Sequence, residues 1–136
     1  MYTAQSNVYF ENSVNTASPA RLLILLCDGA IRHCRQGMEA IKQKNFEKKN
    51  YHLCKAQDIV REWIITLDKD AEIAPSLLSL YDYFLRRLID ANVENDASAV
   101  EEVLEFLKEL KETWVQAELK MKQQGASAGQ HVSQYG

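Results

Sequence analysis

Apolar residues recur along most of the chain at steps of three and four, the spacing that places residues on one face of an α-helix. Short polar segments separate four such stretches, which predict helices over residues 19–42, 46–67, 73–92 and 97–122. No stretch alternates apolar and polar residues as a half-buried strand would. Because short connections make sequential helices antiparallel neighbours, the pattern predicts an all-α fold, an antiparallel up-down four-helix bundle.

Residues that favour helix starts support these boundaries. Ser18 and Asn45 precede the first two helices and Asp96 precedes the fourth, and each side chain can accept a hydrogen bond from a free backbone N–H of the first turn. Pro19 and Pro75 fall in first turns, where the missing N–H of proline is tolerated.

Composition divides the chain into three parts. Residues 1–15 are polar with isolated apolar residues and are predicted to form an N-terminal arm. Residues 16–122 form the bundle. Residues 123–136 are rich in Gly, Ser and Gln, which predicts a disordered C-terminal tail.

The first helix has two unusual features. Residues 22–26 are five apolar residues in succession, and they cover its whole circumference, because helical neighbours are about 100° apart. Gly29 and Gly37 stand inside the helix, although glycine costs up to about 1 kcal/mol there relative to alanine. We therefore expect a neighbouring backbone to approach the helix closely at both glycines.

The predicted helices carry more apolar surface than one bundle seam requires. Contiguous exposed apolar surface usually marks an interaction site, and an amphipathic helix is a common occupant. The sequence thus predicts a partner-binding groove, with Tyr9 and Val14 of the arm covering it when the partner is absent. The alternative is that a slightly irregular bundle, helped by the arm, buries the surplus. The predicted groove residues are Ile24, Ile31, Met38, Ile65, Leu78, Leu85 and Ile89.

Charge and composition limit the classes of partner. The net charge is −3 and the pI is near 5.6, which argues against nucleic acid and anionic membranes, since both favour clustered Lys and Arg. No apolar run reaches the ~18 residues of a membrane-spanning helix, so stable membrane insertion is not expected. Three cysteines and the lack of a signal-peptide pattern favour the cytosol, where thiols stay reduced.

The sequence provides little basis for enzymatic or metal chemistry. Cys27 and Cys34 share one helix face, and His52 and Cys54 follow on the next helix, but the paired short spacings of a zinc site are missing. Nucleophile motifs and glycine-rich phosphate loops are missing as well. We therefore expect no enzyme activity, no metal and no cofactor.

One signalling function remains as an alternative. Residues 33–37, H-C-R-Q-G, loosely resemble the phosphorylated segment of histidine phosphotransfer domains, which are also helical bundles. However, His33 falls on the core-side stripe of its helix, where a phosphodonor cannot reach it. A helical adaptor or a histidine phosphotransfer-like signalling domain is the alternative function.

Several segments together resemble the FliS family of flagellin export chaperones. Residues 9–19 read Y-F-E-N-S-V-N-T-A-S-P, and a leucine-rich helix and D-G-A-I at residues 28–31 follow. K-A-Q-D-I-V at residues 55–60, L-L-S-L-Y-D-Y-F-L-R-R-L-I-D-A at residues 77–91, and residues 103–114 continue the resemblance in order. The chain departs from the family at Cys27, where the family usually has tyrosine.

The resemblance implies a cytosolic, non-enzymatic chaperone. Its client would be the C-terminal segment of flagellin, which is disordered in the monomer and would bind in the hydrophobic grooves in a 1:1 complex. The chaperone would prevent premature polymerisation and deliver flagellin to the flagellar type III export apparatus. The export gate and other flagellar regulators would be further partners.

Overall fold

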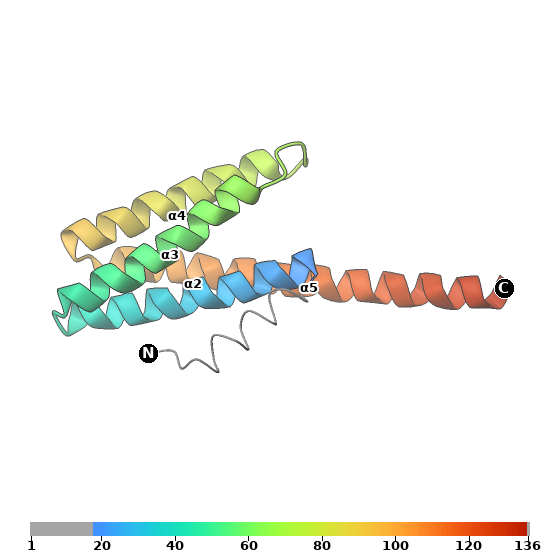
Figure 1. Cartoon of the computed structure of the whole chain (residues 1–136), viewed down its shortest axis with the longest axis horizontal. Coiled ribbons are helices and arrows are strands. Elements are labelled where there is room, and N and C mark those ends of the chain that lie inside the picture. The colour runs from blue at the N-terminus through green and yellow to red at the C-terminus, as the bar shows by residue number, and fades with distance from the viewer. Residues whose placement is uncertain (1–17, 136) are drawn as a thin grey trace. The chain divides into compact units, whose positions relative to one another are not determined.

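The computed structural model describes residues 18–135, with side chains through residue 125. It consists of four α-helices in the predicted order: α2 (Pro19–Lys42), α3 (Phe46–Thr66), α4 (Ala74–Glu94) and α5 (Ala97–Tyr135). Figure 1 shows the helices joined by short connections. The described residues contain no strand, so the predicted all-α four-helix bundle is confirmed.

The predicted caps are present at three helix starts. The backbone N–H of Arg21 donates to Ser18 Oγ at 3.1 Å, and that of Lys48 donates to Asn45 Oδ1 at 3.2 Å. Asp96 accepts from the N–H groups of residues 98 and 99. These bonds satisfy donors that the first turn of a helix leaves free, which explains why the boundaries could be predicted so closely.

The end of α5 differs from the prediction. The sequence pattern predicts an end at residue 122, but α5 continues to Tyr135. No proline interrupts residues 123–135, and Gln and Ala, which favour helices, occur several times. The division of the chain into arm, bundle and tail remains a prediction, and residues 1–17 lie outside the described residues.

The helices form two compact units. One comprises residues 26–109 and contains parts of all four helices; the other combines the described parts of residues 1–25 and 110–136. In the second unit, Ile24 and Leu110 are buried, and Lys122 pairs with Glu118 one turn earlier on α5 at 3.1 Å. The candidate site lies in the unit of residues 26–109.

Helices α2 and α3 are antiparallel and approach closely at glycine. A β-carbon placed on Gly29 would lie 3.4 Å from Ile59 Cδ1, and one placed on Gly37 would lie only 2.6 Å from Leu53 Cδ2. As residue numbers rise along α2, those of the facing residues fall along α3. A close approach is therefore present at Gly37, but it is made by a side chain of α3 and not by the predicted backbone, and the contact at Gly29 is an ordinary van der Waals distance.

The remaining consecutive pairs in this unit are also antiparallel. Lys49, near the start of α3, hydrogen-bonds the carbonyl of Asn92 near the end of α4, while Trp63 contacts Tyr81 with ring centroids 5.4 Å apart. Between α4 and α5, Arg87 pairs with residue 102 and the ring of residue 83 contacts that of residue 106. The order is therefore up-down-up-down.

Apolar side chains from all four helices build the core of this unit. Most come from positions at steps of three and four, as the sequence pattern predicts. The largest fully buried side chains among them are Phe84, Leu53, Leu88, Leu107, Val60, Val100, Val103, Cys27 and Cys34.

Candidate partner-binding surface

The seven residues predicted to line a groove differ widely in exposure. Ile24 and Ile31 are interior residues, with 2% and 7% of their surface exposed. Met38 and Leu85 are half-buried. Leu78 and Ile89 are each 38% exposed and Ile65 is 73% exposed. Tyr9 and Val14 of the predicted arm lie outside the described residues.

Ile24 and Ile31 therefore present little surface to a partner in this structure. A helix that is apolar around its circumference either reserves one side for a partner or is covered on every side. The middle of α2 is covered, since Cys27, Ala30 and Cys34 are also buried, whereas the apolar residues nearer its start, Leu22, Leu23, Leu25 and Leu26, are half-buried. At Ile24 and Ile31 the surplus apolar pattern thus indicated burial in the interior rather than an open face.

Four apolar residues of α4 form one stripe, in which Leu85 is half-buried and the other three are exposed. At about 100° per residue, Leu78, Leu85 and Ile89 point within about 40° of one another. Val93 extends this line by one turn and is 76% exposed, although it is not among the predicted groove residues. Its spacing of four from Ile89 was the available signal. We call Leu78, Leu85, Ile89 and Val93 the α4 stripe.

Ile65 does not belong to this stripe. It lies at the end of α3, and the turn before it carries Arg61, which pairs with Asp58 at 3.4 Å. Thr66, the next residue, donates its hydroxyl to the carbonyl of Glu62. Ile65 is therefore a single exposed apolar side chain beside a polar turn, and single exposed apolar residues are common.

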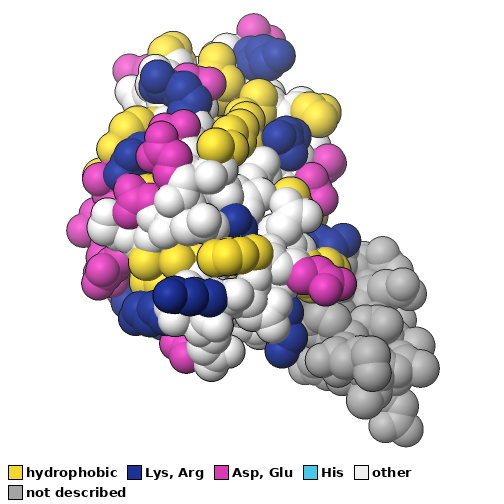
Figure 2. Space-filling view, turned by 90° about the vertical axis from the view of Figure 1, so that its left-hand side faces the viewer, with side chains coloured by type: hydrophobic (Ala, Val, Ile, Leu, Met, Phe, Trp, Pro, Cys, Tyr) yellow, Lys and Arg dark blue, Asp and Glu magenta, His cyan; other side chains and the backbone are white. Residues whose placement is uncertain are grey.

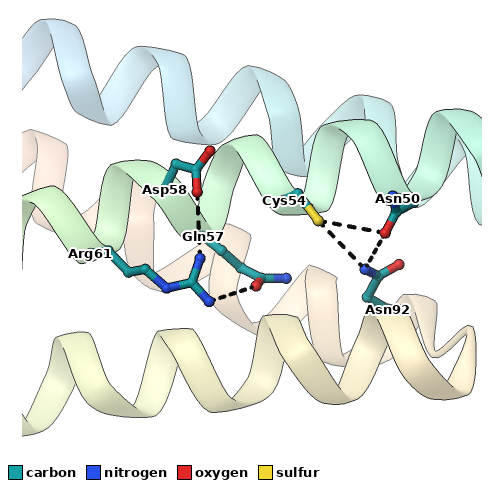
Figure 3. Close-up of polar contacts among 6 residues, drawn as sticks. All are labelled: Asn50, Cys54, Gln57, Asp58, Arg61 and Asn92. Atoms are coloured by element: carbon teal, nitrogen blue, oxygen red, sulfur yellow. Dashed lines mark hydrogen bonds and ion pairs between the residues drawn. The ribbon is translucent and has the colours of Figure 1, made fainter.

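Polar side chains connect α3 and α4 next to the stripe (Figure 3). Asn92 donates from Nδ2 to Asn50 Oδ1 at 3.0 Å, and Cys54 Sγ lies 3.5 Å from the same oxygen. Asn92 is three residues after Ile89, so the carboxamides lie at one end of the stripe. Sequence reasoning missed both asparagines, because their pairing depends on the register between two helices.

Buried Lys49 reinforces the same end of the unit. Its ammonium group donates to the carbonyl oxygen of Asn92 at 2.7 Å and to Asn95 Oδ1. It also lies over the ring of Phe46, 5.1 Å from the centroid. The final turn of α4 leaves carbonyls without partners inside the helix, and a cation there also interacts favourably with the helix dipole. The ammonium group therefore holds the end of α4 against the start of α3.

Two histidines meet between α2 and α3. His33 and His52 approach to 3.1 Å between their Nδ1 atoms, and His33 is only 8% exposed. Burial, followed by the charge of Arg32, lowers the pKa of His33 to about 4, and burial also lowers the pKa of His52. The burial of His33 agrees with its predicted core-side position and leaves little access for a phosphodonor.

The cysteines also fit a packing role. Cys27 and Cys34 are buried, and burial raises the pKa of the Cys34 thiol to about 12, so this thiol stays neutral. A neutral buried thiol acts as a small apolar side chain. Among the described residues, no group of three or more His, Cys, Asp or Glu side chains is placed to hold a metal ion.

The surface charge is mixed. On the face drawn in Figure 2, hydrophobic side chains gather in several patches, with acidic and basic side chains between them. On the α4 surface itself, Arg86 pairs with Asp82 at 3.2 Å. Within the described part of the chain, no helix combines the length and apolar character needed to cross a membrane. These features suit an apolar protein segment better than a polyanion.

Comparisons with known proteins identify the family. A family model described as "Flagellar protein FliS" matches residues 1–121. The chain is 39% identical over 116 residues to the flagellar secretion chaperone FliS of Bacillus subtilis, covering 85% of this chain and 84% of the relative. It is 37% identical over 124 residues to the same chaperone of Salmonella typhimurium, covering 85% of this chain and 92% of the relative. The chain therefore belongs to the FliS family of flagellar proteins.

Proposed function

We propose that this protein is a flagellin export chaperone, and that it binds the C-terminal segment of flagellin on the α4 stripe. Membership of a family of flagellar secretion chaperones supports flagellin as the client. The single structural observation that carries the binding site is the exposed apolar line on α4, where Leu78 and Ile89 are each 38% exposed.

The α4 stripe is suited to an apolar segment. Its residues recur at steps of seven, four and four, so an amphipathic helix laid along α4 can place its own apolar residues against them. Client segments that fold on binding commonly bury about 1,000–3,000 Å², which is more than four side chains can supply. We therefore propose that the client continues beyond the stripe, over surfaces that include Met38 and Ile65.

The chaperone effect follows from covering the segment. A disordered segment with exposed apolar residues can associate with other copies, and occupying it in a 1:1 complex prevents this. Because the bundle is already folded, the ordering cost of ~2–5 kcal/mol or more falls mainly on the client. The complex would form in the bacterial cytosol and be delivered to the flagellar type III export apparatus, whose gate is a further proposed partner.

The N-terminal arm is proposed to occupy the same surface in the free protein through Tyr9 and Val14. An internal segment competes with the client at high effective concentration, so it lowers the apparent affinity. Deleting residues 1–12 should tighten client binding or promote self-association. If neither changes, the arm has no covering role.

The proposal is tested by titrating the full chain with the C-terminal segment of flagellin from the same organism in an isothermal calorimeter. A saturable 1:1 complex is expected. The proposed function would be overturned if the titration gives no heat of binding and the two chains do not co-elute in size-exclusion chromatography, while the far-UV circular dichroism spectrum shows that the protein is still helical.

An Ile89→Asp variant tests the surface. Complete burial of an isoleucine contributes about 1.5–3 kcal/mol, so the 38% of Ile89 that remains exposed accounts for about 0.6–1.1 kcal/mol. A carboxylate buried there adds a desolvation cost, and we expect at least a tenfold loss of affinity. Met121→Asp is the matched control, since Met121 is 64% exposed on α5 and is not part of the stripe.

A further inference from the structure

The carboxamides of Asn50 and Asn92 form a pair with unused hydrogen-bonding capacity. Asn92 Nδ2 donates to Asn50 Oδ1, and Cys54 occupies the same side of the pair. Within residues 18–125, no hydrogen bond of the structure uses Asn50 Nδ2 or Asn92 Oδ1. The pair therefore offers a free amide NH2 group, as donor, and a free amide oxygen, as acceptor.

The position of this pair links it to the α4 stripe. Asn92 follows Ile89 by three residues and precedes Val93, so its side chain borders the apolar line. Asn50 is exposed and Asn92 is half-buried. A segment that covers Ile89 and Val93 would thus also cover the carboxamides and remove water from their free donor and acceptor. An unmet donor or acceptor is costly once water is excluded, so the occupant must supply partners for both.

We infer that the Asn50–Asn92 pair binds the side-chain carboxamide of an Asn or Gln in the client segment, which fixes the register of that segment on the α4 stripe. The inference rests on the proposed function, because it names a specificity determinant of the same surface. An apolar stripe alone tolerates sliding by a helical turn, whereas a polar contact at one end does not.

The chemistry of the pair favours a carboxamide over a peptide group, a carboxylate or an ammonium group. A primary amide presents an acceptor oxygen and a donor N–H side by side on one edge, which complements one free donor and one free acceptor. A trans peptide group directs its C=O and N–H in opposite directions. A carboxylate can only accept and an ammonium group can only donate, so each would leave one atom of the pair without a partner.

The decisive variant is Asn50→Asp. The new carboxylate keeps an oxygen where Asn92 Nδ2 donates, so the contact between α3 and α4 is retained. It removes the free donor. We expect the affinity for the flagellin C-terminal segment to fall about tenfold at high salt as well as at low salt, with the midpoint of thermal unfolding unchanged. Gln36→Glu is the matched control, since it makes the same amide-to-acid change at an exposed position on α2.

Substitutions in the client complete the test. Each Asn and Gln of the segment is changed to Ala, and binding is measured against the unmodified chaperone and against Asn50→Asp. At one client position, the substitution should lower the affinity for the unmodified chaperone about tenfold. The same substitution should lower the affinity for Asn50→Asp little further, because that variant already lacks the contact.

The outcomes separate the two proposals. If Ile89→Asp weakens binding but Asn50→Asp does not, the carboxamide inference is wrong and the α4 stripe stands. If Asn50→Asp weakens binding but no Asn or Gln of the client couples to it, the inference is also wrong. If the client does not bind the unmodified chain at all, the proposed function itself has failed.

Discussion

The contact between Gly37 and Leu53 yields a prediction that distinguishes close packing from ordinary contact. An alanine at position 37 would place its β-carbon 2.6 Å from Leu53 Cδ2 and 3.0 Å from Cγ. Leu53 is completely buried, so its side chain has little room to move. By contrast, an alanine at position 29 meets Ile59 Cδ1 at 3.4 Å, a normal van der Waals distance.

Gly37→Ala and Gly29→Ala are therefore expected to change the free energy of unfolding in opposite directions. Each gains up to about 1 kcal/mol of helix propensity over glycine. At position 37, an added methyl group in a filled core costs about 1–3 kcal/mol, so Gly37→Ala should lose about 1 kcal/mol of unfolding free energy. At position 29 only the gain in helix propensity applies, so Gly29→Ala should raise the free energy of unfolding by up to about 1 kcal/mol. A change of 1 kcal/mol corresponds to roughly 4 °C in the unfolding midpoint of a domain of this size.

Urea unfolding monitored by far-UV circular dichroism measures both changes, with the unmodified chain as the reference. A Gly37→Ala/Leu53→Val double variant should recover part of the loss, because the shorter side chain leaves room for the new methyl group. If Gly37→Ala stabilises the protein as much as Gly29→Ala does, α2 and α3 are not packed as closely as the structure places them.

Two further predictions concern buried side chains that can carry a charge, Lys49 and His33. In chemical denaturation, Lys49→Met should lower the free energy of unfolding by about 1–3 kcal/mol, because the carbonyl of Asn92 loses a charged donor. Lys48→Met, at the exposed neighbouring position, is the control and should change it by less than about 0.5 kcal/mol. The low pKa of His33 should make the free energy of unfolding fall as the pH drops from 6.5 to about 4, because the unfolded chain takes up a proton that the folded state excludes. The expected loss is up to about 3 kcal/mol. A His33→Gln variant should flatten this part of the pH profile of stability without changing it above pH 7.

Local signals in the sequence account for most of the fold. Ser18, Asn45 and Asp96 cap helices through contacts within a few residues, so the starts of three helices could be predicted from residue type. The end of α5 could not, because its C-terminal segment lacks a strong stop signal such as proline.

The candidate site was only partly predictable. Periodicity placed Leu78, Leu85 and Ile89 on one face of their helix, since helical spacing alone determines which residues share a face. It failed for Ile31, because an apolar position on a central helix and one on an exposed helix have the same sequence pattern. The pairing of Asn50 with Asn92 requires the register of α3 against α4, which no local pattern encodes.

Site-specific photo-crosslinking shows whether the client lies on the α4 stripe. A photoreactive amino acid replaces Ile89 in one variant and Met121 in another, and each is irradiated with the flagellin C-terminal segment. We expect a crosslink to the client from position 89, and excess unmodified chaperone should suppress it. A complex that forms normally but crosslinks only from position 121, or from neither position, would contradict it.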